Sequence, residues 1–318
     1  MKITKYIDYS VAKSGNLSHN LAIMKISEIL KKKKLLISFE TFPPKPTADK
    51  ETYQSIVDAA LELSRLRPDF MSVTYGAGGG TSSNTADIAS RINNEGNVPA
   101  LAHLSCISST KEQVAAAVKK LKDAGIENVL ALRGDIPPNA DFVPPNQYKY
   151  AYDLIKELKE TTDFCIGAAC NPEGHPECTN KDEDLDHLKQ KADLGCSFLT
   201  TQMFFDNNMF YNFLYRAQRK GITQPVFAGI MPVTNAAQIK RMVALSNAFM
   251  PRELLNLIDK FGASNEAMKQ AGIDYATHQI IDLISNDVRG IHIYTMNKPD
   301  VARSIMNDIS SIVAAQNA

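Results

Sequence analysis

The most constraining feature of this chain is an alternation of short apolar runs with longer amphipathic stretches, repeated eight times from residue 35 onward. Runs such as Leu35–Phe42, Asp69–Tyr75 and Gly290–Thr295 are typical of strands, while Ala48–Arg65 carries apolar residues at helical spacing. No two runs lie close enough for a hairpin, so each strand must be followed by a helical crossover. The alternation therefore predicts an α/β fold with a parallel sheet.

Eight successive β→α units fit a closed (β/α)8 TIM barrel, with an open doubly wound sheet as the alternative. Open sheets that bind dinucleotides often carry G-x-G-x-x-G, and the nearest string here, at Gly76–Gly80, has the wrong spacing. We therefore predict a single barrel over 35–318, preceded by a helical extension over 1–34. Extra helices are expected before the last strand, at Arg252–Phe261 and Ile273–Asn286.

Composition narrows the classes of function. The 318 residues are 44% hydrophobic and 22% charged, which is ample apolar material for a packed core. Lys plus Arg equals Asp plus Glu at 35 each, which argues against the basic face that nucleic-acid binding needs. No run of about 18 apolar residues predicts a membrane span, and the first residues lack the apolar core of a signal peptide. The 5 cysteines are few and odd in number, so we expect a reduced protein in the cytoplasm.

Four consecutive lysines, Lys31–Lys34, follow a predicted helix at Leu17–Leu30. Lysines at this position complement the negative end of the helix dipole. Polybasic membrane anchors need more charges or a second signal. We interpret the run as a solvated helix end rather than as an anion or membrane contact.

Polar residues stand where the predicted strands end, which is where a barrel carries its active site. Glu40 follows the first strand among apolar neighbours, so partial desolvation would make its carboxyl a usable acid near neutral pH. A structural carboxylate paired with a lysine or arginine is the alternative. The other strand-end residues are Thr74, His103, Arg133, Gly134, Asp135, Asn171, Glu173, His175, Gln202 and Tyr294. Their recurrence in separate units predicts one active site at the barrel mouth.

Several of these residues suit particular ligands. Arg133 offers a planar fork for phosphate or carboxylate, although an Arg–Asp pair with Asp135 inside a turn is the alternative. The amide of Gln202 can hold a heterocycle by paired hydrogen bonds or merely edge the core. The glycines at 76–80 suit a phosphate-binding loop and, equally, a plain flexible loop.

A metal site is the next possibility, raised by Cys170, His175 and Cys178. Their C-x4-H-x2-C spacing lacks a C-x2-C pair, and no fourth ligand is evident. We therefore expect no metal, and we interpret Asn171–Pro176 as a loop that contacts a ligand.

Short strings along the chain, taken in order, resemble the methylenetetrahydrofolate reductase family of flavoproteins. The strings are FETFPP at 39–44, SVTYGAGG at 72–79, HLSC at 103–106, ALRGDIPP at 131–138, PEGHPE at 172–177, TQMFFD at 201–206, GIMPVTN at 229–235 and HIYTMN at 292–297. Each string is weak alone, but the ordered set is specific. The length resembles the bacterial members, which consist of the catalytic barrel alone.

The resemblance implies a site, residue by residue. The general acid falls on Glu40, and an aspartate that modulates the flavin falls on Asp135. Residues implied to bind FAD non-covalently are Thr74, His103, Arg133, Gly134, Asp135, Tyr150, Ala151, Asp153, His175, Asp184 and Lys191. Those implied to bind the folate are Gln202, Gln238, Tyr294 and Lys298. The chain departs from many relatives at Asn171, His187, Met242 and Lys298, which bears on the fit of FAD and on the electron donor.

The activity that the resemblance implies is ping-pong hydride transfer. NADH or NADPH reduces FAD and leaves, and 5,10-methylenetetrahydrofolate is then reduced to 5-methyltetrahydrofolate, feeding methionine synthesis and one-carbon metabolism. Glu40 would protonate the folate and open its bridge. The alternatives are a related reductase fed by a protein partner, an aldolase-type barrel and a non-catalytic folate-binding protein. No obvious Schiff-base lysine stands at a strand end, which argues against the aldolase. The family also suggests a homo-oligomer.

Overall fold

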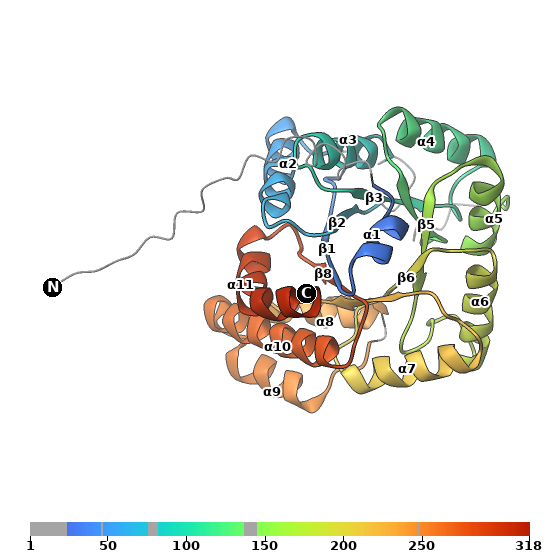
Figure 1. The fold of residues 1–318 in the computed structure, drawn as a ribbon. Coiled ribbons are helices and arrows are strands. Elements are labelled where there is room, and N and C mark those ends of the chain that lie inside the picture. Colours follow the sequence, from blue (N-terminus) through green and yellow to red (C-terminus); the bar gives the residue numbers. More distant parts are fainter. Residues whose placement is uncertain (1–23, 46, 76–81, 137–144, 247) are drawn as a thin grey trace.

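A computed structural model describes residues 24–318, except for 46, 76–81, 137–144 and 247. Eight parallel strands form a closed barrel in sequence order, with the last strand paired to the first (Figure 1). The strands are β1 (Leu36–Thr41), β2 (Phe70–Val73), β3 (Ala100–Ser105), β4 (Asn128–Leu132), β5 (Cys165–Cys170), β6 (Phe198–Thr201), β7 (Val226–Ile230) and β8 (Gly290–Tyr294). The prediction of a (β/α)8 barrel is confirmed, and the open sheet is excluded.

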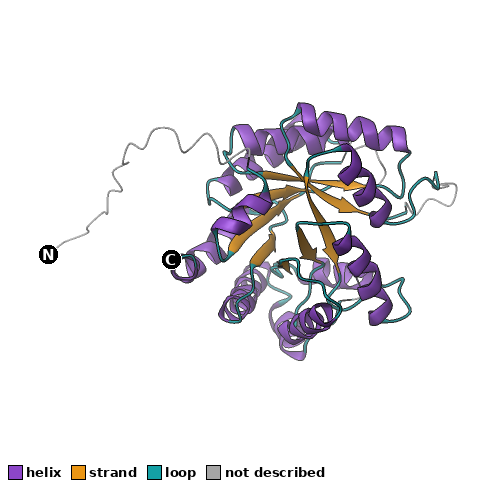
Figure 2. Ribbon diagram, turned by 45° about the vertical axis from the view of Figure 1, so that its right-hand side comes forward, coloured by secondary structure: helices purple, strands orange, loops and turns teal. Residues whose placement is uncertain are grey.

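Helices surround the strands on the outside (Figure 2). Within the described residues they are α1 (Ile26–Lys32), α2 (Lys50–Ser64), α3 (Ser82–Asn94), α4 (Lys111–Asp123), α5 (Ala151–Thr161), α6 (Lys181–Asp193), α7 (Asn207–Arg219), α8 (Ala236–Ser246), α9 (Arg252–Phe261), α10 (Asn265–Ser285) and α11 (Pro299–Gln316). The predicted extra helices before the last strand are therefore present as α9 and α10. None of the helices described is long and apolar enough to cross a membrane.

Each strand turns alternate side chains toward the helices and into the barrel. Ile37 and Phe39 of β1 belong to the core between strands and helices. Leu36, which points to the opposite face of the strand, belongs to a second core inside the barrel. We call this second core the apolar lumen cluster; its buried members are Ile26, Ile29, Leu30, Leu36, Phe70, Leu101, Leu130, Cys165, Phe198 and Phe227.

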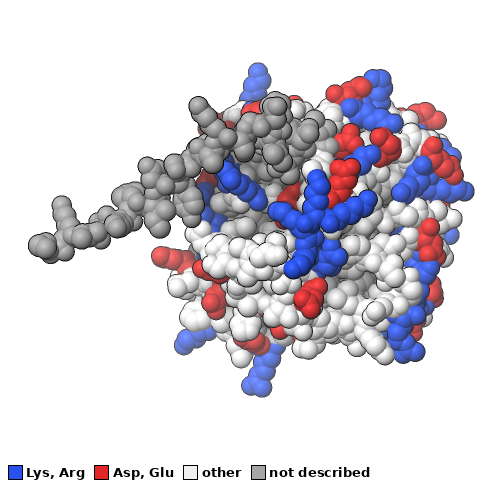
Figure 3. Space-filling view, viewed as in Figure 1, with Lys and Arg blue, Asp and Glu red and all other residues white. Residues whose placement is uncertain are grey.

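Helix α1 closes the barrel at the amino ends of the strands. Its apolar face, Ile26, Ile29 and Leu30, joins the apolar lumen cluster, and in Figure 1 the helix lies in front of the strands. The Arg289 guanidinium, just before β8, donates to the Leu30 carbonyl at 2.8 Å. Lys31 and Lys32 are exposed in the last turn of α1, as the interpretation of a solvated helix end predicts. Figure 3 shows basic side chains gathered over the part of the surface where Figure 1 draws α1.

Among the elements whose predicted span is fully described, β6 and α10 differ most from the sequence prediction. The sequence predicts a strand over 198–205, but β6 ends at Thr201, because Phe204 packs between barrel and helices instead of continuing the sheet. Helix α10 begins at Asn265, eight residues before the predicted start at Ile273. Gly272 ordinarily weakens a helix, but here it lets α10 lie against the backbone of Val233, where a Cβ would overlap the Val233 carbonyl oxygen. The helix predicted at Leu17–Leu30 is wrong at Met24 and Lys25, which are not helical, and at its end, because α1 continues to Lys32. Residues 17–23 and the glycines at 76–80 lie outside the described residues.

Candidate active site

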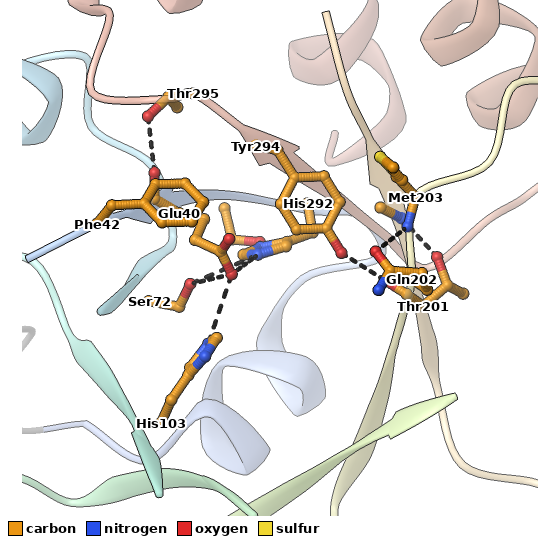
Figure 4. A network of polar contacts seen from close by, with 12 residues as sticks. Glu40, Phe42, Ser72, His103, Thr201, Gln202, Met203, His292, Tyr294 and Thr295 are labelled. Atoms are coloured by element: carbon orange, nitrogen blue, oxygen red, sulfur yellow. Dashed lines mark hydrogen bonds and ion pairs between the residues drawn. The ribbon is translucent and has the colours of Figure 1, made fainter. Parts of the chain in front are cut away.

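The lumen changes character toward the carboxyl ends of the strands. On β1, β2 and β3, the side chains two or four residues beyond the apolar lumen cluster are polar, and Figure 4 shows several polar side chains converging on one point. We call this set the polar lumen cluster; it comprises Ser38 and Glu40 of β1, Ser72 of β2, His103 of β3, and His292 and Tyr294 of β8. The phase of each strand therefore places them over the apolar cluster at the predicted mouth.

Glu40 lies at the centre of this cluster and is only 5% exposed. Its Oε2 atom lies 3.6 Å from Nε2 of His103 and 3.6 Å from Nε2 of His292. The Ser72 hydroxyl donates to the same oxygen at 3.5 Å. No lysine or arginine among the described residues pairs with Glu40, so the alternative of a structural ion pair finds no support. The carboxyl is instead held among uncharged donors and imidazoles.

His103 is neutral in this setting. Burial lowers its pKa to about 4, which outweighs the opposing attraction of Glu40, while nearby His292 lowers it further. Its Nε2 atom is buried and makes no hydrogen bond. The contact between His103 and Glu40 is therefore not an ion pair at neutral pH. An unpartnered nitrogen of this kind is available to a ligand in the barrel mouth.

Tyr294 and Gln202 border the lumen on the side of β6. The Tyr294 hydroxyl donates to the Thr201 carbonyl at 2.6 Å, and burial raises the pKa of this phenol well above its usual value. Gly229 leaves room for the ring, since a Cβ there would come 2.8 Å from it. Gln202 is exposed and accepts a hydrogen bond from its neighbour's backbone, Met203 N, at 2.9 Å. Its amide nitrogen has no partner among the described residues, so it can donate to a ligand.

A cavity of about 270 Å³ lies beside the lumen. It opens between the ends of β4 and β5 and the helices α5 and α6, and we call it the side cavity. Of the residues predicted to bind the cofactor, it is lined by Arg133, Tyr150, Ala151, His175, Asp184 and Lys191. Its lining also includes Asn171 and His187, where the chain departs from many relatives, and Glu177 and Cys178, which sequence reasoning missed as site residues.

The side cavity combines cations with aromatic surface. Arg133 Nη1 donates to Glu177 Oε2 at 2.5 Å, while its buried Nε makes no hydrogen bond. Lys191 Nζ donates to the Ala169 carbonyl at 2.6 Å, and burial lowers the pKa of this ammonium group. The rings of Tyr150 and His187 stack with centroids 5.8 Å apart. Such a lining suits a ligand that has both phosphate groups and an aromatic ring.

Other predicted residues lie around these two regions. Gly134 has φ of +78°, and a Cβ there would come 2.7 Å from Ser105, so glycine is required. Asp135 is exposed beside it, next to the undescribed segment 137–144. Thr74 is held at the end of β2, where its backbone nitrogen donates to the Thr41 carbonyl at 3.0 Å.

Asp153 takes a different place from the cavity residues. Its Oδ2 accepts hydrogen bonds from the backbone nitrogens of Lys149 at 2.8 Å and Tyr150 at 3.0 Å, so it caps the start of α5. It is not among the residues that line the side cavity. Any effect of Asp153 on a ligand there would act through the position of Tyr150.

Gln238 lies across the mouth, where it lines a narrow crevice with Met242 and Met296. Lys298 lies at the same edge, because its Nζ donates to the hydroxyl of Thr234 at 2.7 Å, and Thr234 also lines this crevice. The predicted substrate residues therefore surround the lumen, with Tyr294 beside Glu40, with Gln202 just after the end of β6, and with Gln238 and Lys298 farther along the rim.

Sequence reasoning missed three members of the polar lumen cluster, namely Ser38, Ser72 and His292. The available signal was spacing: Ser38 precedes Glu40 by two positions and His292 precedes Tyr294 by two, so each pair shares one face of its strand. As for metals, no three His, Cys, Asp or Glu residues in the described part of the chain are grouped to hold an ion. The thiol of Cys178 instead donates to Asp184 at 3.8 Å.

Comparisons with known proteins agree on one family. A family model described as methylenetetrahydrofolate reductase matches residues 25–310. A 5,10-methylenetetrahydrofolate reductase of Pectobacterium carotovorum is 34% identical over 273 residues, which cover 86% of this chain and 89% of that protein. The protein of the same name from Escherichia coli K12 is 33% identical over 273 residues, covering 86% and 90%.

A solved structure gives an independent comparison of the fold. A Clostridium thermocellum protein, described as binding two copies of 5-methyl-5,6,7,8-tetrahydrofolic acid, matches with a TM-score of 0.60 at 14% identity. The match covers 92% of this chain and 100% of that one. At this identity the likeness shows the shared barrel fold alone.

Proposed function

This chain belongs to the methylenetetrahydrofolate reductase family, and from that premise we propose that it reduces 5,10-methylenetetrahydrofolate to 5-methyltetrahydrofolate with bound FAD and a nicotinamide donor. One observation carries the proposal. Glu40 is a buried carboxyl without a lysine or arginine partner in the described residues, and it stands at the barrel mouth where a substrate nitrogen can reach it. A group so placed is suited to general acid chemistry.

The residues of the side cavity support FAD as the cofactor. Arg133, with its unpartnered buried Nε, and Lys191 would meet the phosphates, and Tyr150 offers a face for a ring. Gly134 would let the backbone come close to the cofactor. His103 Nε2 is a free hydrogen-bonding nitrogen between this cavity and Glu40. When bound, FAD supplies the hydride chemistry, and the protein's part is to bind, orient and polarise.

The residues around Glu40 would bind and activate the folate. Glu40 donates a proton to a ring nitrogen of methylenetetrahydrofolate, so that the one-carbon bridge opens to an iminium that can accept a hydride. Gln202 offers its free amide nitrogen to the pterin-like ring, and Tyr294 encloses the same side. Gln238 and Lys298 would meet more distant parts of the substrate. Asp135 places a negative charge near the cofactor, which disfavours anionic forms there and favours a cationic folate.

Anaerobic stopped-flow measurement on the purified full-length chain tests the proposal. We expect released FAD on denaturation, bleaching of the bound flavin by NADH or NADPH, and reoxidation by methylenetetrahydrofolate. Protein that stays colourless after incubation with FAD would contradict the cofactor. Reoxidation by folate after chemical reduction, without bleaching by either nicotinamide, would indicate a protein electron donor. Ligand binding without turnover would indicate a non-catalytic folate-binding protein.

We also expect the protein to work in a reducing compartment as a homo-oligomer. The five cysteines are all free, which supports the cytoplasm. The oligomer is carried over from the family, and light scattering on the purified chain measures it.

A further inference from the structure

Ser38 and His292 are buried residues of the polar lumen cluster that have no role in the function proposed above. They lie on neighbouring strands, where the register places Ser38 opposite His292 and Glu40 opposite Tyr294. The exposed fractions are 0% for Ser38 and 2% for His292. A buried imidazole is costly unless its nitrogens find partners, and those partners decide which nitrogen carries the proton.

Both ring nitrogens of His292 have polar neighbours. Nδ1 lies 2.8 Å from the Ser38 hydroxyl oxygen, a normal hydrogen-bond distance. Nε2 lies on the other side, 3.6 Å from Oε2 of Glu40 and 3.5 Å from the hydroxyl of Ser72. The Ser38 hydroxyl can also reach the Ile291 carbonyl, but at the longer distance of 3.2 Å. The distance between Ser38 Oγ and Nδ1 fits donation in either direction, but Oε2 of Glu40 is an acceptor on the Nε2 side, which favours the ring proton on Nε2 and donation from Ser38 to Nδ1.

We propose that His292 is the positioning residue for Glu40, with Ser38 donating to Nδ1 so that the proton of the neutral ring sits on Nε2 and points toward Oε2. This inference rests on the proposed function, in which Glu40 is the acid. Ser72 donates to the same oxygen at 3.5 Å. Donors therefore gather on Oε2, whereas no hydrogen bond among the described residues involves Oε1. The acid proton of Glu40 is left to Oε1, the oxygen open to a ligand.

This arrangement also prepares the site for the charge that forms. When the O–H bond at Oε1 breaks and the proton bonds to a folate nitrogen, negative charge spreads to Oε2. The Nε2–H of His292 and the Ser72 hydroxyl already point there, so no reorientation is required. His292 itself neither gains nor loses a proton. The other titratable groups that face Glu40 are His103, at 3.6 Å, and the Tyr294 phenol on the same strand as His292.

The competing explanation is that His292 only fills space. Its ring lies nearly parallel to Phe70, with centroids 6.3 Å apart, and meets Tyr294 edge-on at 5.3 Å. Two substitutions of similar polarity separate packing from hydrogen bonding. His292→Gln can place an amide nitrogen where Nε2 was, while His292→Asn can reach only the position of Nδ1. A packing role predicts no advantage for the glutamine.

The first test reads the tautomer directly and does not depend on activity. Nitrogen-15 NMR of histidine-labelled full-length protein resolves protonated from unprotonated ring nitrogens, and the signals absent in His292→Gln identify His292. We expect Nε2 protonated and Nδ1 unprotonated, with the Nδ1 signal displaced in Ser38→Ala, which removes one atom. A proton on Nδ1, or an unchanged spectrum in Ser38→Ala, would overturn the proposal even if the enzyme reduces folate.

The second test follows the two half-reactions. We expect His292→Asn to slow the oxidation of reduced enzyme by methylenetetrahydrofolate about 10²-fold, the usual effect of a misplaced reacting group. The folate concentration that gives half of the maximal rate should change little. His292→Gln should retain most of the rate, and reduction by the nicotinamide should persist in both. Equal losses in the two variants, or equal losses in both half-reactions, would contradict the positioning role. If the unaltered chain fails to reduce folate while the NMR result holds, the proposed function fails and the hydrogen-bond arrangement stands.

Discussion

The two halves of the barrel lumen share strands β1, β2 and β3 but contribute differently to the protein. In the amino-terminal half, the rings of Phe70, Phe198 and Phe227 pack with centroids 5.2–6.0 Å apart, and α1 closes this end of the barrel. The carboxyl-terminal half, one or two inward positions farther along, holds Glu40 and His292 in hydrogen-bonding surroundings. A shift of two or four residues, about 7–13 Å along a strand, thus separates a region that stabilises the fold from one that is suited to chemistry.

Glycines make the contrast sharper. Gly167 and Gly290 face the rings of Phe198 and Phe227 so closely that a Cβ on either would overlap the ring. In the apolar half, large rings therefore fill the space that glycines leave open, so a substitution that adds or removes side-chain volume there is poorly tolerated. The polar half keeps atoms without partners, such as Nε2 of His103. Unmet hydrogen-bonding capacity is costly in a core and useful in a binding site.

The comparison is tested hardest by Glu40→Gln, a nearly isosteric change in the polar half. Opening the folate bridge needs an acid, whereas direct hydride transfer from the nicotinamide does not. We expect folate-dependent reoxidation to slow by about 10²–10⁴-fold or more, the usual contribution of a positioned general acid. Reduction by the donor should stay largely intact in the same stopped-flow experiment. Equal loss in both half-reactions would make Glu40 structural, and no loss would place the acid elsewhere.

The apolar half should respond in the opposite way to Phe227→Ala. Removing this buried ring should lower the free energy of unfolding by about 3–5 kcal/mol, through lost burial and the cavity left behind. Denaturant unfolding measures the loss. The two half-reaction rates per folded molecule should fall together or not at all. Tyr215→Ala, at a ring that is 61% exposed on α7, is the control and should change stability by less than about 0.5 kcal/mol. A selective loss of folate turnover in Phe227→Ala would show that the apolar half also takes part in the folate half-reaction.

The barrel and most strand-end residues were predictable from the sequence because each depends on local pattern. Alternating apolar runs predict β→α units, and a polar residue at the end of such a run predicts a place at the mouth. The same logic failed for β6, where the sequence predicts a strand as far as Phe205 but residues 203–205 lie outside the sheet. It also failed at α10, where Gly272 serves packing against Val233 rather than a helix end.

The missed site residues depend on contacts between distant segments. His292 stands in the middle of an apolar strand, and its role appears only when β8 pairs with β1 to bring Ser38 and Glu40 beside it. Arg133 and Glu177 are 44 residues apart and meet only across the side cavity. Periodicity along one element cannot reveal such pairs, because they are set by register and loop geometry.

A smaller effect is expected at Asp135, which lies outside both halves of the lumen. Asp135→Asn removes a negative charge near the proposed cofactor, so reduced forms that carry negative charge become less unfavourable. Because Asp135 is exposed, the interaction is screened to roughly 1 kcal/mol, which corresponds to about +20 mV for a two-electron couple. Folate turnover should also fall if this charge favours a cationic folate. Spectroelectrochemical titration measures the potential, and an unchanged or lower value would contradict the placement of Asp135 near the flavin.

The smallest expected effect concerns the side cavity and asks whether its ion pair competes with the cofactor. Arg133 is held by Glu177, whose side chain is 65% exposed, so the pair contributes no more than about 1 kcal/mol. Glu177→Gln should release the guanidinium for a phosphate and tighten FAD binding by up to about fivefold, measured by fluorescence titration of the flavin-free protein. Glu183→Gln is the matched control: Glu183 lines the same cavity but accepts from Thr179 instead. Equal tightening in both variants would mean that the loss of any negative charge in the cavity, and not the release of Arg133, strengthens FAD binding. Weaker binding in Glu177→Gln alone would mean that Glu177 orients Arg133 for the phosphate rather than withholding it.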